Sequence, residues 1–514
     1  MARVTLTSNG VTRRQFLHSV GAMTVGGIAL STLDLDAATD DVGPTRPSRI
    51  RKALKVQPVL TYEIPKRREA TSWRSWGGIQ TEEDATKEKE RITAELNKLK
   101  GQAEFPLEIL PVALVKSLDQ AKAAAATEFD TMLLYAAGGG WGGIFETLTG
   151  HKDRSSLMFL RHDPGPVYLW YEIVHPRYLR KTVDEYDTKL SMDFNDVVVD
   201  KYDELLWRLR ALSGLRQTLG KRIVSIGGSG GWGAGGQKAP TISKELWKLD
   251  LVDYPYKDLE PRLKAAFQDT ALVARCERAA ARYLKQPRTT LETTRPFVNN
   301  AFVLMEVLKD VMDQAKTDAI TINSCMGTIM PMSKTTACLP LSLLNDDGYL
   351  AFCESDYVVI PSGIFLHYTS GLPVFLNDPT YPHNGVVTLA HCTAPRKMDG
   401  KKNERARILT HFESDYGAAP KVEMKLGQIT TNLVPDFNCK KWVGFAGTVV
   451  GNPFLDICRS QVDVKVHGNA DALLEQMKGF HWMLSYGDYL RECGYALKKL
   501  GIEFLNVSAP AKVA

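Results

Sequence analysis

Short apolar runs alternate with longer charged segments along the first two thirds of the chain. Apolar residues recur at helical or strand spacing, which predicts alternating helices and strands. The predicted elements cover residues 82–100, 129–136, 202–219, 222–226, 301–315, 319–323 and 337–344. Strands that alternate with helices in this way are typical of βα units, so we expect parallel sheets in this part of the protein.

Shorter apolar runs follow one another in the last third of the chain. They predict strands at residues 349–353, 373–376, 386–391, 407–412, 421–426 and 462–466. A strand-rich C-terminal domain is therefore expected after the α/β part. The sequence contains no internal repeat, and its 514 residues are enough for roughly three domains of about 150 residues each.

The N-terminal region differs from the rest of the chain. An Arg13–Arg14 pair precedes a weakly apolar run over 20–33, an order that resembles a twin-arginine (Tat) export signal. An ordinary basic N-terminus before a short buried helix is the alternative. We assign residues 1–38 to a Tat signal peptide and the aperiodic residues 39–58 to a linker. No later run reaches the roughly 18 uncharged apolar residues that cross a bilayer. We therefore expect a soluble periplasmic or exported protein, with the Tat translocase as a partner and no stable membrane span.

Charge and cysteine content narrow the possible functions. The formal net charge is +5 and basic residues are interspersed with acidic ones, so nucleic acid is not an expected partner. The eight cysteines all lie in the second half of the chain and form no close C-x-x-C pair, which argues against a zinc ribbon. We interpret them as small buried hydrophobic residues, with disulfides after export as the alternative.

A glycine-rich loop directly follows one predicted strand. Residues 228–233 match G-x-G-x-x-G at the position of a dinucleotide-binding turn. However, Trp232 lies inside the loop, and the expected second strand with a terminal acidic residue is missing, because 244–249 is predicted as helix. We therefore favour a ligand-facing loop over a nicotinamide site. A similar loop at 138–143 contains Trp141, and both tryptophans are candidates for stacking on a sugar or for packing anchors.

Two carboxylates occupy the C-terminal ends of predicted strands. Glu354 and Asp378 each follow a short strand, and the ligands of α/β sheets gather at such ends. His481 opens a mainly apolar strand near the C-terminus. Two carboxylates and an imidazole form a donor set suited to Mn²⁺ or Mg²⁺. On spacing alone, solvated or salt-bridged side chains are the alternative. Three other histidines compete for the ligand role: His383, His391 and His467.

Several short motifs occur in an order that spans most of the chain. They are the run 319–325, Ala337-Cys338, Asn345-Asp346-Asp347-Gly348, Cys353-Glu354-Ser355-Asp356, Asp378, the run 384–390, and the run 481–488. In this order they resemble the L-fucose isomerase and L-arabinose isomerase superfamily. The resemblance implies an α/β fold with two parallel-sheet N-terminal domains, followed by a C-terminal domain with an antiparallel β-barrel. We place these domains at 59–215, 216–368 and 369–514.

The same resemblance implies a metal centre and a reaction. Glu354, Asp378 and His481 would hold the metal, typically Mn²⁺, with another divalent cation such as Mg²⁺ as the alternative. Glu354 and Asp378 would also be catalytic, interconverting an aldose and a ketose through a cis-enediol intermediate. Which carboxylate removes the proton from C2 stays open.

The resemblance also suggests partners. The substrate would be a monosaccharide, and four residues are expected to contact it: Trp141, Trp232, Asn384 and His391. Family members are oligomers in which a neighbouring subunit's first domain closes the site, so a homo-oligomer such as a trimer or hexamer is expected. Well-known members are cytoplasmic, whereas this chain carries a Tat-like signal. The region between Asp378 and His481 is also shorter than in the fucose enzymes, which leaves the sugar open.

Two other functions compete with the isomerase hypothesis. A non-catalytic exported carbohydrate-binding protein would keep the fold and the pocket without turnover. An exported oxidoreductase would fit the Tat signal, but the glycine loop is the one cofactor motif that the sequence offers it.

Overall fold

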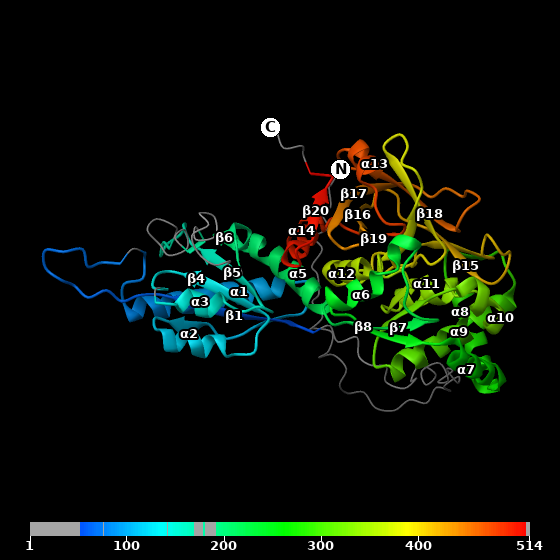
Figure 1. Ribbon diagram of the computed structural model, residues 1–514, viewed down its shortest axis with the longest axis horizontal. Helices are drawn as coiled ribbons and strands as arrows, with labels where there is room; N and C mark the ends of the chain where they lie inside the picture. Colours follow the sequence, from blue (N-terminus) through cyan, green and yellow to red (C-terminus); the bar gives the residue numbers. More distant parts are fainter. Residues whose placement is uncertain (1–51, 76, 141, 169–177, 180–191, 510–514) are drawn as a thin grey trace, which may run out of the picture. The chain divides into compact units, whose positions relative to one another are not determined.

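The structure is a computed structural model that describes residues 52–75, 77–140, 142–168, 178–179 and 192–509. The predicted Tat signal and Trp141 lie outside the described residues. Residues 49–514 form one compact unit. Within it, parallel sheets come first along the chain and antiparallel strands follow (Figure 1).

The first sheet is parallel throughout. Its strands run in the order β2-β1-β4-β5-β6, with β3 also beside β1. The strands are β1 (Leu54–Thr61), β2 (Leu107–Ile109), β3 (Ala113–Val115), β4 (Thr131–Ala136), β5 (Ser155–Leu160) and β6 (Val197–Val199). The accompanying helices are α1 (Glu82–Gln102), α2 (Leu118–Ala125), α3 (Ile144–Thr149) and α5 (Tyr202–Thr218). Every residue of β4 is buried, as expected for a parallel sheet with both faces covered.

A second parallel sheet has the order β11-β10-β7-β8. Its strands are β7 (Arg222–Ile226), β8 (Asp250–Tyr254), β10 (Ala319–Ile322) and β11 (Leu350–Cys353). The helices between and after them are α6 (Ala239–Glu245), α7 (Tyr256–Gln268), α8 (Thr270–Leu284), α9 (Arg295–Gln314), α10 (Met330–Ser333), α11 (Cys338–Asp346) and α12 (Ile360–Ser370). The C-terminal end of β11 delivers Glu354 to the candidate site.

Strand β8 overturns one sequence-based expectation. The strand that was judged missing after the glycine loop is present, and α6 ends at Glu245 instead of a helix spanning 244–249. Among the described residues, β8 pairs with β7 alone and lies at the edge of its sheet, with Asp250 and Asp253 exposed. An edge strand needs no continuous apolar run, so its pattern was not recognised as a strand.

The C-terminal part forms a closed antiparallel β-barrel, which confirms the expected fold class. Its strands follow the order β16-β19-β12-β13-β18-β17, and pairing of β17 with β16 closes the ring. They are β12 (Phe375–Pro379), β13 (Val386–His391), β16 (Ile429–Val434), β17 (Lys441–Gly451), β18 (Ser460–Val466) and β19 (Trp482–Tyr486). Closure leaves no unpaired edge between these strands. The candidate residues Asp378, His391 and His481 lie on or directly beside barrel strands.

Other elements surround the barrel. Strand β20 (Glu503–Asn506) pairs with β17 in parallel, and helices α13 (Ala470–Gln476) and α14 (Leu490–Lys499) belong to the same region. A small mixed sheet has the order β15-β14-β9, formed by β9 (Thr289–Leu291), β14 (Arg405–Leu409) and β15 (Ala419–Glu423).

Several strand boundaries differ from the sequence-based ones. β1 begins at Leu54, inside the predicted linker 39–58, because residues from Leu54 onward pair with β2 and β4. β14 and β15 begin two residues earlier than predicted, since their mutual pairing from Arg405 to Leu409 sets both ends. The division into three domains stays a prediction.

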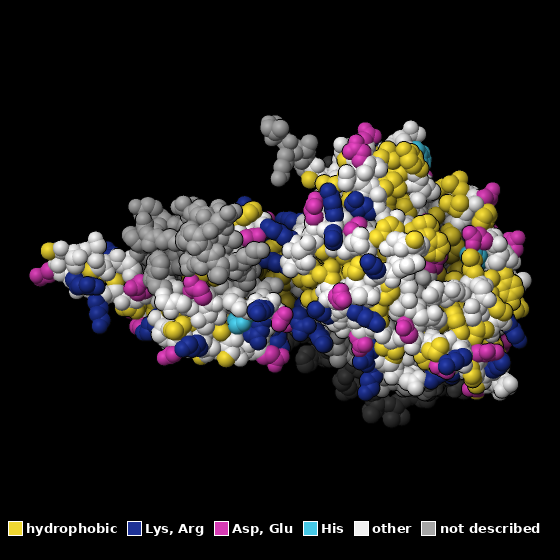
Figure 2. Space-filling model, in the orientation of Figure 1, with side chains coloured by type: hydrophobic (Ala, Val, Ile, Leu, Met, Phe, Trp, Pro, Cys, Tyr) yellow, Lys and Arg dark blue, Asp and Glu magenta, His cyan; other side chains and the backbone are white. Residues whose placement is uncertain are grey.

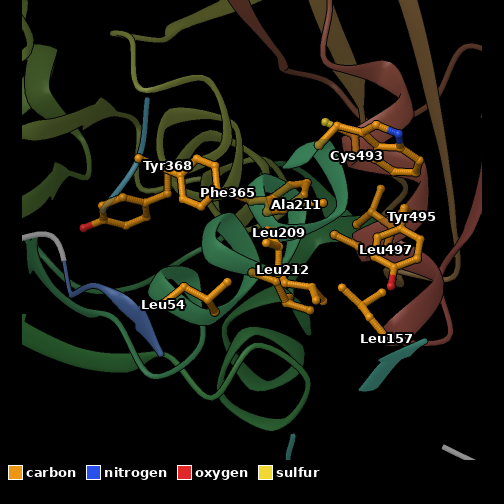
Figure 3. Packing of buried hydrophobic residues seen from close by; sticks show 14 of the residues in the cluster. Leu54, Leu157, Leu209, Ala211, Leu212, Phe365, Tyr368, Cys493, Tyr495 and Leu497 are labelled. Carbon is orange, nitrogen blue, oxygen red and sulfur yellow. The ribbon is translucent and has the colours of Figure 1, made fainter. Parts of the chain in front are cut away.

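Helix α5 packs in a hydrophobic cluster shared by early and late parts of the chain. It contacts both α12 and α14. Figure 3 shows members of this cluster, among them Leu54, Leu157, Leu209, Ala211, Leu212, Phe365, Tyr495 and Leu497. Because α5 is enclosed by partners, it is buried almost continuously from Leu209 to Leu215.

The surface agrees with the small net charge. On the face shown in Figure 2, Lys and Arg side chains are interspersed with Asp and Glu, with no stripe of one sign. Within the described residues, no helix combines the length and the apolar character that a membrane span requires.

Candidate metal centre

Glu354 enters the site through a strained turn at the end of β11. Glu354 and Ser355 have φ values of +64° and +48°, in the left-handed region that residues with a Cβ atom rarely adopt. The backbone N–H of Ser355 donates to Thr321 Oγ1 at 3.1 Å, which helps to hold the turn. Non-glycine residues in this conformation cluster at functional sites, where the surrounding structure over-determines them.

The structure brings together the three residues that the sequence singled out. His481 Nε2 lies 3.3 Å from Glu354 Oε2 and 3.3 Å from Asp378 Oδ1. His481 is fully buried beside the start of β19, whereas both carboxylates are about one-third exposed. Asp378 is held in β12 by pairing with Ala390 of β13. Two carboxylates of different strands thus meet one buried imidazole nitrogen.

His391, at the end of β13, belongs to the same group. Its Nε2 atom lies 3.7 Å from Glu354 Oε1, and the ligand atoms of Asp378, His391 and His481 all lie within 4.8 Å of one another. The sequence had placed His391 among the substrate-binding residues and among the competing ligands. Its position makes it a fourth candidate donor to the same centre.

Several donor atoms of this group are buried without a hydrogen bond. Within the described part of the chain, Glu354 Oε2, Asp378 Oδ1, His391 Nε2 and His481 Nε2 lack hydrogen-bond partners. Buried polar atoms are rarely left unpaired. Carboxylate oxygens and imidazole nitrogens are the donors that Mn²⁺ accepts, so this set fits the expected divalent cation.

The carboxylates and histidines of the group shift one another's pKa values. Burial favours the neutral form of Glu354, yet contacts with His391 and His481 hold its pKa well below the usual range. Burial also opposes the charge on His481, but Asp356 and Glu354 raise the pKa of His481 to about 10. For Asp378, burial dominates and raises the pKa, partly offset by the two histidines. The two carboxyls therefore differ in basicity although they share one site.

Asp356 is a member of the group that sequence reasoning missed. Its Oδ2 atom lies 2.8 Å from His481 Nδ1, and its Oδ1 accepts hydrogen bonds from the backbone N–H groups of Trp232 and Val358, both at 3.1 Å. A carboxylate on the second ring nitrogen of a ligating histidine sets its tautomer and orientation. The residue stood inside the motif Cys353-Glu354-Ser355-Asp356, but its partner is 125 positions away along the chain.

The glycine loop forms one wall of the centre. Gly230 O accepts the backbone N–H of Tyr357 at 3.0 Å, which ties the loop to the segment after Glu354. Trp232 stacks on Phe480 with ring centroids 4.5 Å apart, and its ring stands nearly perpendicular to that of His481 with centroids 5.7 Å apart. Both aromatic side chains are partly exposed. The ligand-facing role expected for the loop and for Trp232 stays a prediction that this placement favours.

A carboxylate of β8 binds the same loop. Asp253 accepts hydrogen bonds from the backbone N–H and the hydroxyl of Ser229, at 2.8 Å and 2.6 Å. The acidic residue of a dinucleotide site would instead be free to meet a ribose. Although strand β8 is present, the geometry therefore gives no added support to a nicotinamide site.

The remaining candidates lie elsewhere. Asn384 is exposed in the turn between β12 and β13. The His467 Nε2 atom lies 2.7 Å from the Thr448 hydroxyl, and His383 is exposed with Nδ1 near Tyr381 O. These histidines are not among the grouped donors of the described residues. Trp141 lies outside the described residues.

No known family model matches the sequence, and no curated protein is significantly similar to it.

Proposed function

We propose that this protein is a divalent-metal-dependent isomerase that interconverts an aldose and a ketose. One observation carries the proposal: Glu354, Asp378 and His481 converge at a strand-end site with buried donor atoms that lack hydrogen-bond partners in the described structure. The motif order that resembles the fucose and arabinose isomerases supports the same assignment.

Each residue would have a distinct part. Glu354, Asp378 and His481 would hold Mn²⁺ or Mg²⁺, with His391 as an additional donor. When bound, the cation would act as a Lewis acid that stabilises the negative charge developing on the substrate oxygens. One of the two carboxylates would remove the proton from C2 and the other would serve the C1 side or a hydroxyl, through a cis-enediol.

The aromatic wall supports a sugar as the substrate class. Trp232 and Phe480 lie stacked beside His481 and keep part of their surface exposed. Aromatic faces suit the apolar C–H faces of a sugar ring, while the carboxylates suit its hydroxyls. The panel of sugars in the experiment below identifies the substrate.

Deuterium exchange tests the proposal directly. The purified protein is incubated with Mn²⁺ and a panel of free aldoses and ketoses in D₂O, and NMR follows deuterium next to the carbonyl. We expect exchange together with aldose–ketose conversion for one substrate class. Glu354→Gln or Asp378→Asn should lower the rate by at least about 100-fold, because each removes a proton-transfer group.

Glu475→Gln is the matched control, since Glu475 is an exposed carboxylate of α13. It should exchange at the rate of the unchanged protein. Bound metal without exchange for any sugar would reject the isomerase and favour the alternative, a non-catalytic carbohydrate-binding protein.

We also propose that the protein is exported. The Arg13–Arg14 pair and the apolar run after it support recognition by the Tat translocase and a periplasmic location. The Tat system carries folded proteins, so the metal would be loaded before export. A homo-oligomer is proposed from the family resemblance.

A further inference from the structure

A second group of metal-binding side chains lies outside the centre described above. The ligand atoms of Cys338, Cys392 and His411 all lie within 4.8 Å of one another, and the three residues are at most 6 % exposed. Cys338 and Cys392 form a small cluster of their own with Ala419, separate from the larger hydrophobic cores. None of these side chains belongs to the carboxylate and histidine group around His481.

Cys458 is the candidate for a fourth donor. It is half-buried and packs against the same small cluster. The four residues come from different elements: Cys338 begins α11, Cys392 follows β13, His411 follows β14 and Cys458 precedes β18. Tertiary packing therefore assembles three thiols and one imidazole that have no regular spacing in the sequence.

Two polar residues, Arg459 and Ser414, border the cluster. The Arg459 guanidinium Nε donates to Thr410 O at 2.8 Å, next to His411. The Ser414 hydroxyl lies 3.2 Å from His411 Nδ1, a contact that orients the ring. Three thiolates and a neutral imidazole around a divalent ion carry one net negative charge, and Arg459 lies beside them to balance it.

The donor set selects the metal. Thiolates suit Zn²⁺, which binds four Cys and His ligands in closed tetrahedral structural sites, whereas Mn²⁺ and Mg²⁺ prefer oxygen. We propose that Cys338, Cys392, Cys458 and His411 hold one structural Zn²⁺ ion, which ties the start of α11 to three loops of the C-terminal strands. None of its four ligands is a proposed ligand of the isomerase centre.

Metal content and X-ray absorption of the unchanged protein test the site first. The protein is expressed with zinc, dialysed with excess Mn²⁺, and measured by mass spectrometry for metals and by zinc-edge absorption. We expect one zinc per chain, with sulfur neighbours at about 2.3 Å and one nitrogen donor. Zinc absent after loading, or zinc with only light-atom neighbours, would overturn the proposal.

Variants then assign the ligands. Cys392→Ser and Cys458→Ser should each lose the zinc, whereas Cys276→Ser and Cys493→Ser should keep it, because these two buried cysteines lie in α8 and α14 away from the cluster. Glu354→Gln should also keep the zinc, which separates this site from the first. Zinc retained by both Cys392→Ser and Cys458→Ser would overturn the ligand assignment.

Thiol counting in denaturant addresses the competing disulfide and does not require a variant to fold. After removal of zinc by a chelator, we expect all eight cysteines to react as free thiols. A count of six, with a cross-link between two of Cys338, Cys392 and Cys458 found by peptide mapping, would replace the zinc site with a disulfide.

Discussion

At the residue scale, one short turn places two carboxylates around a single imidazole. Glu354 meets Nε2 of His481, and Asp356, two positions further on, meets Nδ1 of the same ring. The left-handed conformation of Glu354 and Ser355 lets side chains so close in sequence reach opposite sides of one histidine. The strain of the turn is thus linked to the geometry of the candidate metal centre.

Asp356 is expected to act as a positioning residue for His481. Asp356→Asn removes the carboxylate that orients the imidazole, so the affinity for Mn²⁺ should fall roughly 10- to 100-fold. Titration of Mn²⁺, followed by electron paramagnetic resonance, measures this affinity. The thermal unfolding midpoint of the metal-free variant checks that the fold is kept.

Asp253→Asn is the matched control for this prediction. It removes a carboxylate that holds the same glycine loop through Ser229, but Asp253 does not contact His481. Its Mn²⁺ affinity should equal that of the unchanged protein. Equal affinities for both variants would show that the contact between Asp356 and His481 does not support metal binding.

At the scale of elements, the turn between β12 and β13 accounts for an asparagine at position 384. No substrate contact is needed to explain it. Asn384 and Gly385 have φ values of +51° and +76°, and His383 and Val386 bond to each other across the turn. An Asn-Gly pair with two positive φ values is the preferred two-residue hairpin turn. The hairpin in turn sets the pairing that places Asp378 opposite Ala390.

Substitutions in this turn separate its structural role from a substrate role. Gly385→Val should destabilise the protein by about 1–3 kcal/mol, because a β-branched residue is strained at this φ, although no atom lies within 4 Å of the added Cβ position. Asn384→Gly keeps a permitted conformation and should leave both the thermal midpoint and the sugar dependence of exchange unchanged. If the Asn384→Gly variant needed a higher sugar concentration to reach half of its maximal exchange rate, Asn384 would again be assigned as a substrate-binding residue.

For the whole molecule, the fold combines parallel sheets with a closed barrel, and a buried charge makes its stability depend on pH. Lys421 of β15 is 1 % exposed, and its ammonium group donates to two backbone carbonyls, of Asn452 and Gln461, at 3.4 Å each. Burial lowers the pKa of Lys421 from 10.5 to about 8. The folded state therefore binds fewer protons than the unfolded state between these two values.

The sign of this effect gives a test. Stability should rise with pH from about 8 to 10.5, because in that range the unfolded chain still holds the proton that the folded chain has released. Below pH 8 the buried charge costs about 3 kcal/mol at most. Lys421→Met should raise the thermal midpoint at pH 7, and the gain should vanish near pH 10.5. Lys402→Met, at an exposed position, is the control and should show no such gain. A gain for Lys421→Met that is independent of pH would contradict the pKa argument.

Local pattern was enough for much of the fold. The strands β7 and β13 begin and end where the apolar runs predicted, and α1 and α5 differ from prediction by two residues or fewer. Alternating strands and helices indicated parallel sheets, because periodicity depends on neighbouring residues alone. The closed barrel and the grouping of Glu354, Asp378 and His481 were expected from motif order, not from spacing.

Only tertiary structure revealed the features that depend on distant partners. It shows that β16 and β17 are the strands whose pairing closes the expected barrel, and it reveals β8 as an exposed edge strand whose polar residues hide it in the sequence. Asp356 contacts His481, which lies 125 positions away along the chain. The cysteine and histidine cluster likewise draws on four separate elements. Apolar periodicity reports which face of an element is buried, but it does not report which distant side chain meets it there.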